Sequence, residues 1–194
     1  MELVYDKPIN HFDLDDALLL KNYSKGDNDA FNILYSRHKD KSYRFILRQV
    51  KTQVTAEELH QELWIKVINN ASSFETKAKF TTWLFTMASN LIIDTARHMK
   101  VVNNVIDDRY QESDGIEQVS PETSYKNIQE KSAIKDCLAK LPHMQLQTFL
   151  LREEAGLSNA DIAKVLDVTL EATKSRIRYA YQGLRDCLRI KMVL

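Results

Sequence analysis

The sequence predicts an all-α protein in which two helical domains are joined by a flexible acidic linker, the C-terminal domain being a helix-turn-helix. Apolar residues recur at three- and four-residue steps along most of the chain, which is the period of an amphipathic helix. The 194 residues include only four glycines and three prolines. Few breakers therefore interrupt the helices, and no glycine-rich phosphate-binding loop can be written. We expect domains over residues 1–103 and 131–194, with the linker over 104–130.

Two helices are predicted in the first part of the N-terminal domain. Asp13 or Asp15 can cap a short helix, because a carboxylate accepts hydrogen bonds from the free backbone N–H groups of the first turn. That helix then breaks off, and Asp27 can cap a second helix. Its apolar residues run from Ala30 to Leu47 at helical spacing.

Two longer helices complete this domain. Thr55 and Glu58 have the spacing of a capping box, which predicts the start of a helix over residues 55–70. Residues 71–77 lack a helical period and are predicted to form a loop before a fourth helix over 79–98. The apolar stripes that we expect to face the core comprise Leu59, Leu63, Trp64, Val67 and Ile68, then Phe80, Trp83, Leu84, Met87 and Leu91.

Charge is distributed unevenly along a chain whose formal net charge is zero. Residues 104–130 carry seven acidic and two basic side chains, a net charge of −5, whereas residues 131–194 carry 11 basic and seven acidic ones, a net charge of +4. An acidic segment without sustained apolar periodicity is typical of a flexible tether. The neutral total therefore does not exclude a nucleic-acid-binding domain, because charge must be read segment by segment.

Four more helices are predicted in the C-terminal domain. The first ends before Pro142, and the second ends near Gly156, a residue type common just past helix C-termini. Ser158 can cap a short third helix over 159–166. The fourth helix extends over about 170–191 and is the longest of the four.

The last two of these helices have the spacing of a DNA-binding helix-turn-helix. Asp167 begins the three-residue turn between them and can adopt the left-handed conformation that such turns often need. Small Ala163 lets the helices approach closely, and Ile177 continues the apolar face. An α-helix fits the major groove of DNA, where cationic side chains contact base edges and phosphates. The polar face of the second helix presents Lys174, Ser175, Arg176, Arg178 and Tyr179.

A second candidate nucleic-acid site lies in the N-terminal domain. Phe74, Phe80 and Trp83 flank a loop that contains Lys77 and Lys79. Aromatic rings beside cations suit unpaired bases, which stack on aromatic faces and can be rotated out of a duplex. We expect Trp83 to contribute mainly to the core, whereas the roles of Phe74 and the lysines stay open.

The cysteines and histidines do not indicate a metal or catalytic site. Cys137 and Cys187 lack metal-ligand spacing and do not make a disulfide framework, so we expect two buried free thiols. Glu57 and His60 have the spacing of a helical di-iron ligand pair, but such a site needs a second pair and two further glutamates. We therefore expect His60 on a helix surface, and a protein that is neither an enzyme nor the carrier of a metal or another cofactor.

The two candidate regions, in this order, resemble the sigma-70 family of bacterial RNA polymerase initiation factors. The matching residues of the first are G-D-x-x-A-F from Gly26, A-E-E-L-x-Q-E from Ala56, and F-x-x-W-L-x-x-x-A-x-N-x-x-x-D-x-x-R from Phe80. Those of the second are L-P at Leu141, G-L-S at Gly156, I-A at Ile162 and K-S-R at Lys174. The resemblance covers about residues 12–100 and 131–190. The short layout without a third domain is similar to the extracytoplasmic function (ECF) group.

The resemblance implies a sigma factor that binds core polymerase, recognises the −10 and −35 promoter elements and promotes DNA melting. The helix over 55–70 would dock on the coiled coil of the β′ subunit through Glu58, Gln61, Glu62 and Ile65. The −10 element would be contacted by Phe74, Lys77, Lys79, Phe80, Thr82, Trp83, Thr86, Asn90 and Arg97. The C-terminal domain would dock on the β flap and contact the −35 element through Ser158, Thr169, Lys174, Ser175, Arg176, Arg178 and Tyr179.

Several positions depart from the family pattern. Ser89 stands where the family often has arginine, Glu171 where it has a small glycine, and Tyr179 and Tyr181 where basic residues are common. Tyrosines in place of cations should weaken the attraction to phosphates and its salt dependence. The resemblance also implies an anti-sigma factor as a further partner, and an acidic linker that threads toward the RNA exit path.

A stand-alone helix-turn-helix transcriptional regulator is the alternative. It accounts for residues 142–191 but leaves the residues of 55–98 without a role, and the sequence shows no dimerisation helix for reading paired half-sites. The sequence shows neither a signal peptide nor an apolar run of the length of a membrane span. We therefore expect a cytoplasmic protein without membrane insertion.

Overall fold

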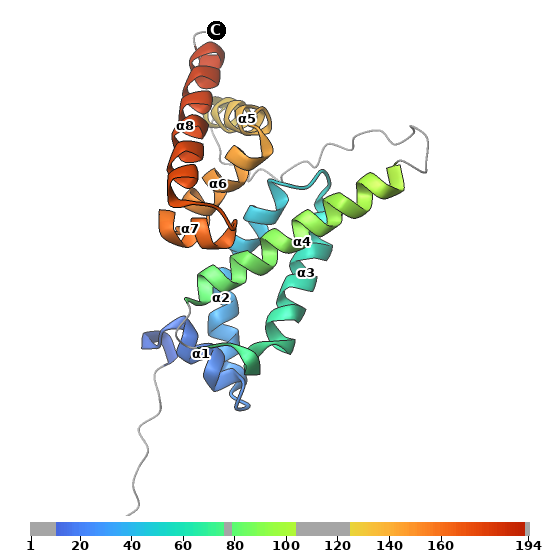
Figure 1. Ribbon diagram of the computed structural model, residues 1–194, viewed down its shortest axis with the longest axis vertical. Coiled ribbons are helices and arrows are strands. Elements are labelled where there is room, and N and C mark those ends of the chain that lie inside the picture. The colour runs from blue at the N-terminus through green and yellow to red at the C-terminus, as the bar shows by residue number, and fades with distance from the viewer. Residues whose placement is uncertain (1–10, 76–78, 104–124, 193–194) are drawn as a thin grey trace, which may run out of the picture.

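The computed structural model describes residues 11–75, 79–103 and 125–192, and within these ranges the secondary structure is entirely helical, as predicted (Figure 1). No helix in this part of the chain combines the length and apolar character needed to cross a bilayer. The helices of the N-terminal half are η1 (His11–Asp13), α1 (Asp16–Tyr23), α2 (Asn28–Leu47), α3 (Gln53–Asn69), η2 (Ala71–Ser73) and α4 (Phe80–Asn103). Those of the C-terminal half are α5 (Tyr125–Ala139), α6 (His143–Glu153), α7 (Asn159–Val165) and α8 (Leu170–Met192).

Short polar side chains fix the starts of several helices. Asp15, Asp27 and Ser158 each accept a hydrogen bond from the backbone N–H three residues later, at 2.7, 3.1 and 3.2 Å. These caps confirm the predicted starts of α1, α2 and α7. The predicted capping box is wrong, because α3 begins earlier and is capped by Thr52, whose hydroxyl accepts from the N–H of Thr55 at 3.1 Å.

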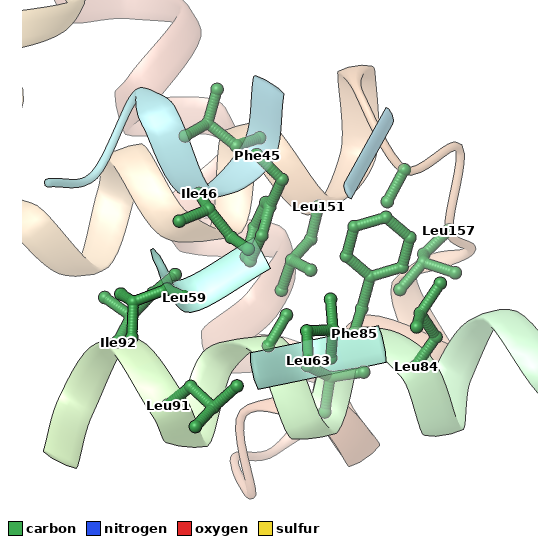
Figure 2. Packing of buried hydrophobic residues seen from close by; sticks show 14 of the residues in the cluster. Phe45, Ile46, Leu59, Leu63, Leu84, Phe85, Leu91, Ile92, Leu151 and Leu157 are labelled. Atoms are coloured by element: carbon green, nitrogen blue, oxygen red, sulfur yellow. The ribbon is translucent and has the colours of Figure 1, made fainter. Parts of the chain in front are cut away.

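A continuous cluster of buried hydrophobic side chains runs through both halves of the molecule (Figure 2). Phe45 of α2 and Phe85 of α4 are fully buried, and their rings meet edge to face with centroids 5.2 Å apart. Leu151 of α6 and Ile162 of α7 belong to the same cluster and are also fully buried. Burying a large apolar side chain contributes about 1.5–3 kcal/mol, so this cluster is the main source of stability.

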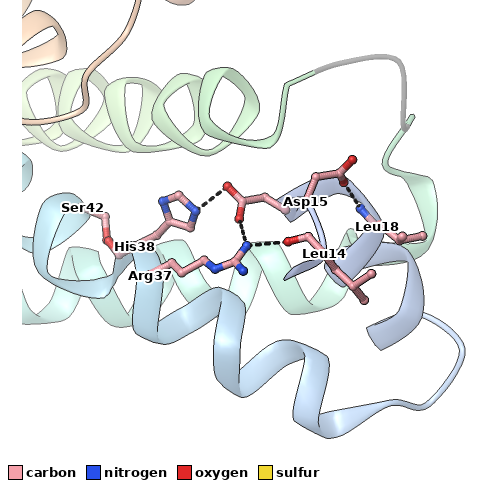
Figure 3. Close-up of polar contacts among 7 residues, drawn as sticks. Leu14, Asp15, Leu18, Arg37, His38 and Ser42 are labelled. Atoms are coloured by element: carbon pink, nitrogen blue, oxygen red, sulfur yellow. Dashed lines mark hydrogen bonds and ion pairs between the residues drawn. The ribbon is translucent and has the colours of Figure 1, made fainter. Parts of the chain in front are cut away.

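A network of ion pairs ties α1 to α2 (Figure 3). The Asp16 carboxylate accepts hydrogen bonds from Arg37 Nη1 at 2.8 Å and from His38 Nε2 at 2.7 Å. Arg37 also donates to the backbone carbonyl of Leu14 at 2.8 Å. Burial raises the pKa of Asp16, but the hydrogen bonds from His38 and Arg37 more than offset this, and its pKa lies below the ordinary value.

His60 lies between α2 and α3 rather than on a helix surface, so the prediction for this residue is wrong. Its Nε2 accepts a hydrogen bond from the Trp64 indole at 3.0 Å and lies 3.1 Å from the Ser42 hydroxyl. Burial lowers the pKa of His60, against the opposing effects of a backbone hydrogen bond at Lys39 and the nearby Asp40 carboxylate. A neutral imidazole that accepts a hydrogen bond fits this position.

Cys137 of α5 and Cys187 of α8 form a disulfide bond with their Cα atoms 5.8 Å apart. The expectation of two free thiols is therefore wrong. The two positions are separated by 50 residues in the chain, and only the packing of α5 against α8 brings them together. The bond ties α5 to the C-terminal half of the helix whose first turns carry the predicted DNA contacts.

We expect Asp16→Asn to lower the free energy of unfolding at pH 7 by about 1–3 kcal/mol, because it leaves charged donors on α2 with a weaker partner. A carboxylate with a depressed pKa stabilises the fold above its unfolded pKa of about 3.9 and loses that effect as the pH falls through the folded pKa. The deficit should therefore shrink below about pH 4. Urea unfolding across the acid range measures it, with Asp186→Asn, which alters an exposed carboxylate of α8, as the control.

We expect reduction of the disulfide, or the pair Cys137→Ser and Cys187→Ser, to destabilise the C-terminal helices by about 2–4 kcal/mol, because a closed loop of this length restricts the unfolded chain. Hydrogen exchange of α5 and α8 with and without reductant measures this loss. The double variant should be insensitive to reductant. Equal protection of α5 in the oxidised and reduced proteins would contradict the prediction.

Candidate nucleic-acid interface

The turn between α7 and α8 has the geometry of a helix-turn-helix. Asp167 has a φ angle of 50°, in the left-handed region, which confirms the prediction for this residue. Thr169 caps α8, and its hydroxyl accepts a hydrogen bond from the N–H of Ala172 at 3.1 Å. Thr173 is fully buried and lies on the inner face of the first turns of α8. The opposite face of these turns is exposed to solvent.

The solvent face of α8 carries most of the predicted DNA contacts. Lys174, Arg178 and Tyr179 are exposed, and Ser175 is half-buried. The Lys174 ammonium pairs with Glu171 one turn earlier at 2.8 Å, and the Arg178 guanidinium lies 5.0 Å from the centre of the Tyr179 ring. These exposed pairs are easily exchanged for contacts with another molecule, because surface ion pairs contribute little.

Arg176 has a different environment from the other cations of α8. It is half-buried, and its Nη1 atom is buried without a hydrogen-bond partner among the described residues. Arg176 is therefore less accessible to DNA than Lys174 and Arg178.

Ser158 and Lys79 meet at one carboxylate, although the sequence places them in different candidate sites. The Asp161 side chain accepts hydrogen bonds from Ser158 Oγ at 2.6 Å and from Lys79 Nζ at 2.8 Å. The hydrogen bond from Lys79, and to a smaller extent that from Ser158, holds the pKa of Asp161 below its ordinary value. The structure thus brings a predicted −10 residue against the start of the helix-turn-helix.

Three aromatic side chains form a cluster at the start of α4. The ring centre of Phe74 lies 5.0 Å from Trp83 and 6.3 Å from Phe80. Phe80 is almost completely buried and packs on His38, so it supports the cluster from the core. Phe74 and Trp83 are half-buried and keep part of their rings accessible. Lys77 lies outside the described residues.

A polar pocket of about 370 Å³ lies between the end of α3 and the middle of α4. Trp83 forms part of its wall, and Asn90 and Asp94 line it one turn apart on α4. Lys66 of α3 and Asn70, the residue after α3, also line it, and the other lining residues are Ser73, Met87 and Leu91. Asp94 was not predicted as a site residue, although it lies four residues after Asn90. No local sequence pattern could indicate that Lys66 and Asn70 line the same pocket.

The other predicted −10 residues on α4, Thr82, Thr86 and Arg97, do not line this pocket. Arg97 is exposed, and its Nη1 lies 3.5 Å from the Asp94 carboxylate, so it borders the pocket from the next turn of α4. Thr86 donates its hydroxyl proton to the Thr82 carbonyl at 2.8 Å, and the Thr82 hydroxyl is itself buried. Neither threonine lines the pocket.

The outer face of α3 carries all four residues predicted to bind polymerase. Glu58, Gln61, Glu62 and Ile65 are exposed at helical spacing. Two further apolar residues, Val54 and Ile68, are also exposed, at 64% and 40%. The expectation that Ile68 faces the core is therefore wrong. Exposed apolar side chains among carboxylates are typical of a protein-docking surface rather than of a nucleic-acid contact.

The C-terminal helices form an apolar groove of about 580 Å³ that sequence analysis did not anticipate. Its walls come from α5, α6 and α8, and the edge-to-face pair of Phe149 and Tyr181 lies at one end, with ring centres 5.4 Å apart. Arg185 and Arg189 also line it. The other lining residues are Ile134, Leu138, Leu184 and Leu188.

No group of side chains within the described ranges has the composition and spacing to hold a metal ion. The exposed chemistry of this part of the chain is that of binding surfaces, namely a cationic helix, a polar pocket beside aromatic rings, and two apolar docking faces.

The sequence was compared with protein families and with individual proteins. The family described as Sigma-70 region 2 matches residues 34–100, and the one described as Sigma-70, region 4 matches residues 131–182. These ranges contain the polar pocket and the helix-turn-helix respectively. The chain is 30% identical over 178 residues to the ECF RNA polymerase sigma factor SigW of Bacillus subtilis, covering 88% of this chain and 95% of that protein.

Two solved structures share the fold. One is the sigma factor RpoE in complex with the anti-sigma factor NepR from Bartonella quintana, at a TM-score of 0.71 and 22% identity, covering 82% of this chain and 97% of that one. The other is CnrH in complex with the cytosolic domain of CnrY, at a TM-score of 0.67 and 19% identity, covering 90% and 97%. By its two family matches and its similarity to SigW along nearly its whole length, the chain belongs to the ECF group of the sigma-70 family of RNA polymerase sigma factors.

Proposed function

We propose that this sigma factor binds core RNA polymerase, reads the −10 and −35 promoter elements and promotes strand opening, with residues 1–103 and 131–194 as its two working domains. The observation that carries the proposal is the presence of two complementary DNA surfaces, one on α4 and one on α8. A polar pocket beside aromatic rings suits single-stranded DNA, and an exposed cationic helix after a helix-turn-helix suits a duplex.

The pocket on α4 has the features of a receptor for one unpaired −10 base. Trp83 offers an aromatic wall for stacking, and Asn90 and Asp94 offer polar groups to a base edge. A carboxylate accepts hydrogen bonds, so Asp94 favours a base with an exocyclic amino group, that is adenine, cytosine or guanine rather than thymine. Lys66 supplies a cation for a phosphate or a carbonyl oxygen. Binding a base there would offset the cost of unstacking it, so strand opening needs no ATP.

The −35 element would lie along the solvent face of α8. Lys174 and Arg178 are exposed there and can reach base edges and phosphates of the major groove. Thr169 and Ser158 cap α8 and α7, and free backbone N–H groups at helix N-termini attract phosphates. On this face Lys174 and Arg178 are exposed and Arg176 is half-buried, and so small a number of cations is consistent with weak binding of duplex DNA by the isolated chain.

Core polymerase would hold each domain by an apolar surface. The outer face of α3, with Ile65 at its centre, suits the β′ coiled coil. The groove between α5 and α8 suits an amphipathic helix of the β flap, with Arg185 and Arg189 pairing with its acidic residues. An anti-sigma factor would act by covering the same surfaces. We place the protein in the cytoplasm, where its polymerase acts, and assign it no catalytic site of its own.

The direct test is run-off transcription with core polymerase. We expect purified chain to direct initiation from promoters mapped after its forced expression, and core subunits to co-purify with it. A stand-alone regulator would bind duplex DNA without core enzyme and would leave the Sigma-70 region 2 match without a role. Absence of both co-purification and initiation would overturn the proposal.

We expect Arg178→Ala to weaken use of the −35 element by about 1–3 kcal/mol, because it removes a major-groove contact. Initiation from a mapped promoter and from the same promoter with a scrambled −35 sequence measures the effect. Lys140→Ala, which removes an exposed cation after α5, is the control and should leave both promoters unchanged. A loss of equal size on the scrambled promoter would argue against this contact.

We expect Asp94→Asn to change the preferred base at one −10 position, because an amide can donate as well as accept a hydrogen bond. Abortive initiation on promoters carrying each of the four bases at that position measures the preference. Asp29→Asn, an exposed carboxylate on α2, should retain the wild-type order. The same base order in wild type and Asp94→Asn would exclude Asp94 from base recognition.

A further inference from the structure

A small polar cluster lies between α2 and α3, apart from the surfaces assigned to DNA and polymerase. α3 packs against α2 (Figure 1), and His60 of α3 lies at this contact. The side chains around its ring are those of Ser42, Tyr43 and Trp64. Ser42 is fully buried and Trp64 is 5% exposed. Polar groups in such a place must satisfy one another, because water has little access to them.

The hydrogen bonds of this cluster require one protonation state of the ring. The indole nitrogen of Trp64 can only donate a hydrogen bond, and it lies 3.0 Å from His60 Nε2. Nε2 is therefore the unprotonated nitrogen, and the proton of the neutral ring is on Nδ1. The ring also forms a hydrogen bond with the backbone of Lys39.

A second proton on the ring would break this arrangement. The N–H groups of His60 Nε2 and of the Trp64 indole would then point at each other across 3.0 Å. Ser42 can still accept a hydrogen bond from a protonated ring, because its own proton can go to the backbone carbonyl of His38, 2.8 Å away. The cost therefore falls on Trp64, whose buried N–H loses its acceptor.

The charged and titratable neighbours of His60 do not cancel this effect. Burial lowers the pKa of His60, and the backbone hydrogen bond at Lys39 and the Asp40 carboxylate raise it to a smaller extent. The ordinary pKa values of carboxylates, tyrosines and lysines lie outside the range from about 5.5 to 7.5, whereas that of histidine, about 6.5, lies inside it. The neighbours in question are Tyr35, Lys39, Asp40 and Tyr43 of α2 and Glu57 of α3.

The helix that carries this cluster also carries the face proposed to bind polymerase. Gln61 and Ile65 follow His60 and Trp64 directly in the chain, and both are exposed. Consecutive residues of an α-helix lie about 100° apart around its axis. The two sets are therefore neighbouring sides of one helix, and a shift of α3 on α2 moves the docking face as well.

We propose that His60 is a positioning residue, which holds α3 on α2 through Trp64 only while its ring is neutral, and that mild acid thereby weakens docking of α3 on core polymerase. The proposal rests on the proposed function, because that function assigns the outer face of α3 to polymerase. The folded protein binds this proton less readily than the unfolded chain does. The free energy of unfolding therefore falls as the pH drops through about 6.5, and this effect ends below the folded pKa.

The test measures the affinity of the full oxidised chain for core polymerase between about pH 7.5 and 5.5. The informative variant is His60→Gln, because a glutamine amide can accept from Trp64 and donate to a backbone carbonyl but does not titrate. We expect the affinity of wild type to fall about fivefold more over this range than that of His60→Gln. The matched control is His98→Gln, which removes an exposed histidine of α4 and should keep the wild-type pH dependence.

The indole N–H resonance of Trp64 in NMR gives a second readout, which does not need polymerase. Assigned by comparison with Trp64→Phe, it should shift and exchange faster in wild type below about pH 6.5 but not in His60→Gln. A Trp64 resonance that does not change with pH in wild type would overturn the titration of His60. The same pH dependence of core binding in wild type and His60→Gln would overturn the positioning role. Absence of core binding by every variant at all pH values would instead contradict the proposed function, and the Trp64 resonance would still report the titration.

Discussion

Burial of the apolar surface of α4 is the constraint on which the rest of the structure depends. One part of that surface packs on α2 and α3, and another receives α7. Phe85 and Leu84 are fully buried because both sets of neighbours cover them. One helix therefore organises the N-terminal core and also holds the C-terminal domain, while Asn90 and Asp94 on the same helix remain available to line the polar pocket.

Electrostatic contacts give this packing its orientation. The partly buried carboxylates of Asp16, Glu154 and Asp161 each meet a donor from a distant part of the chain, and each has a pKa below its ordinary value. Such contacts add little attraction after the cost of removing charge from water, but they disfavour any arrangement that leaves the carboxylate without its partner. Asp16 orders helices within one domain, whereas Glu154 and Asp161 join two domains.

The surfaces of the chain divide by chemistry in a way that matches its proposed partners. Cations on α8 and the polar pocket on α4 suit nucleic acid, and the apolar residues of α3 and of the C-terminal groove suit protein. The disulfide between Cys137 and Cys187 connects these roles, because it joins α5, a wall of the groove, to α8, which carries the DNA-facing residues. Positioning of the groove and of the recognition helix thus depends on one pair of helices.

The sequence by itself determined the all-α class, the caps at Asp27 and Ser158, and the turn at Asp167, because hydrophobic period, capping and left-handed turns depend on neighbouring residues. It narrowed the first cap to Asp13 or Asp15, and the structure chose Asp15. Motif order also indicated the family. Only the tertiary structure decided the disulfide, the inward position of His60 and the meeting of Lys79 with Asp161. These features join residues on different helices, and no local pattern records which helices pack together. For the same reason the sequence did not indicate that Lys66 and Asn70 line the pocket of Asn90, because they come from another part of the chain.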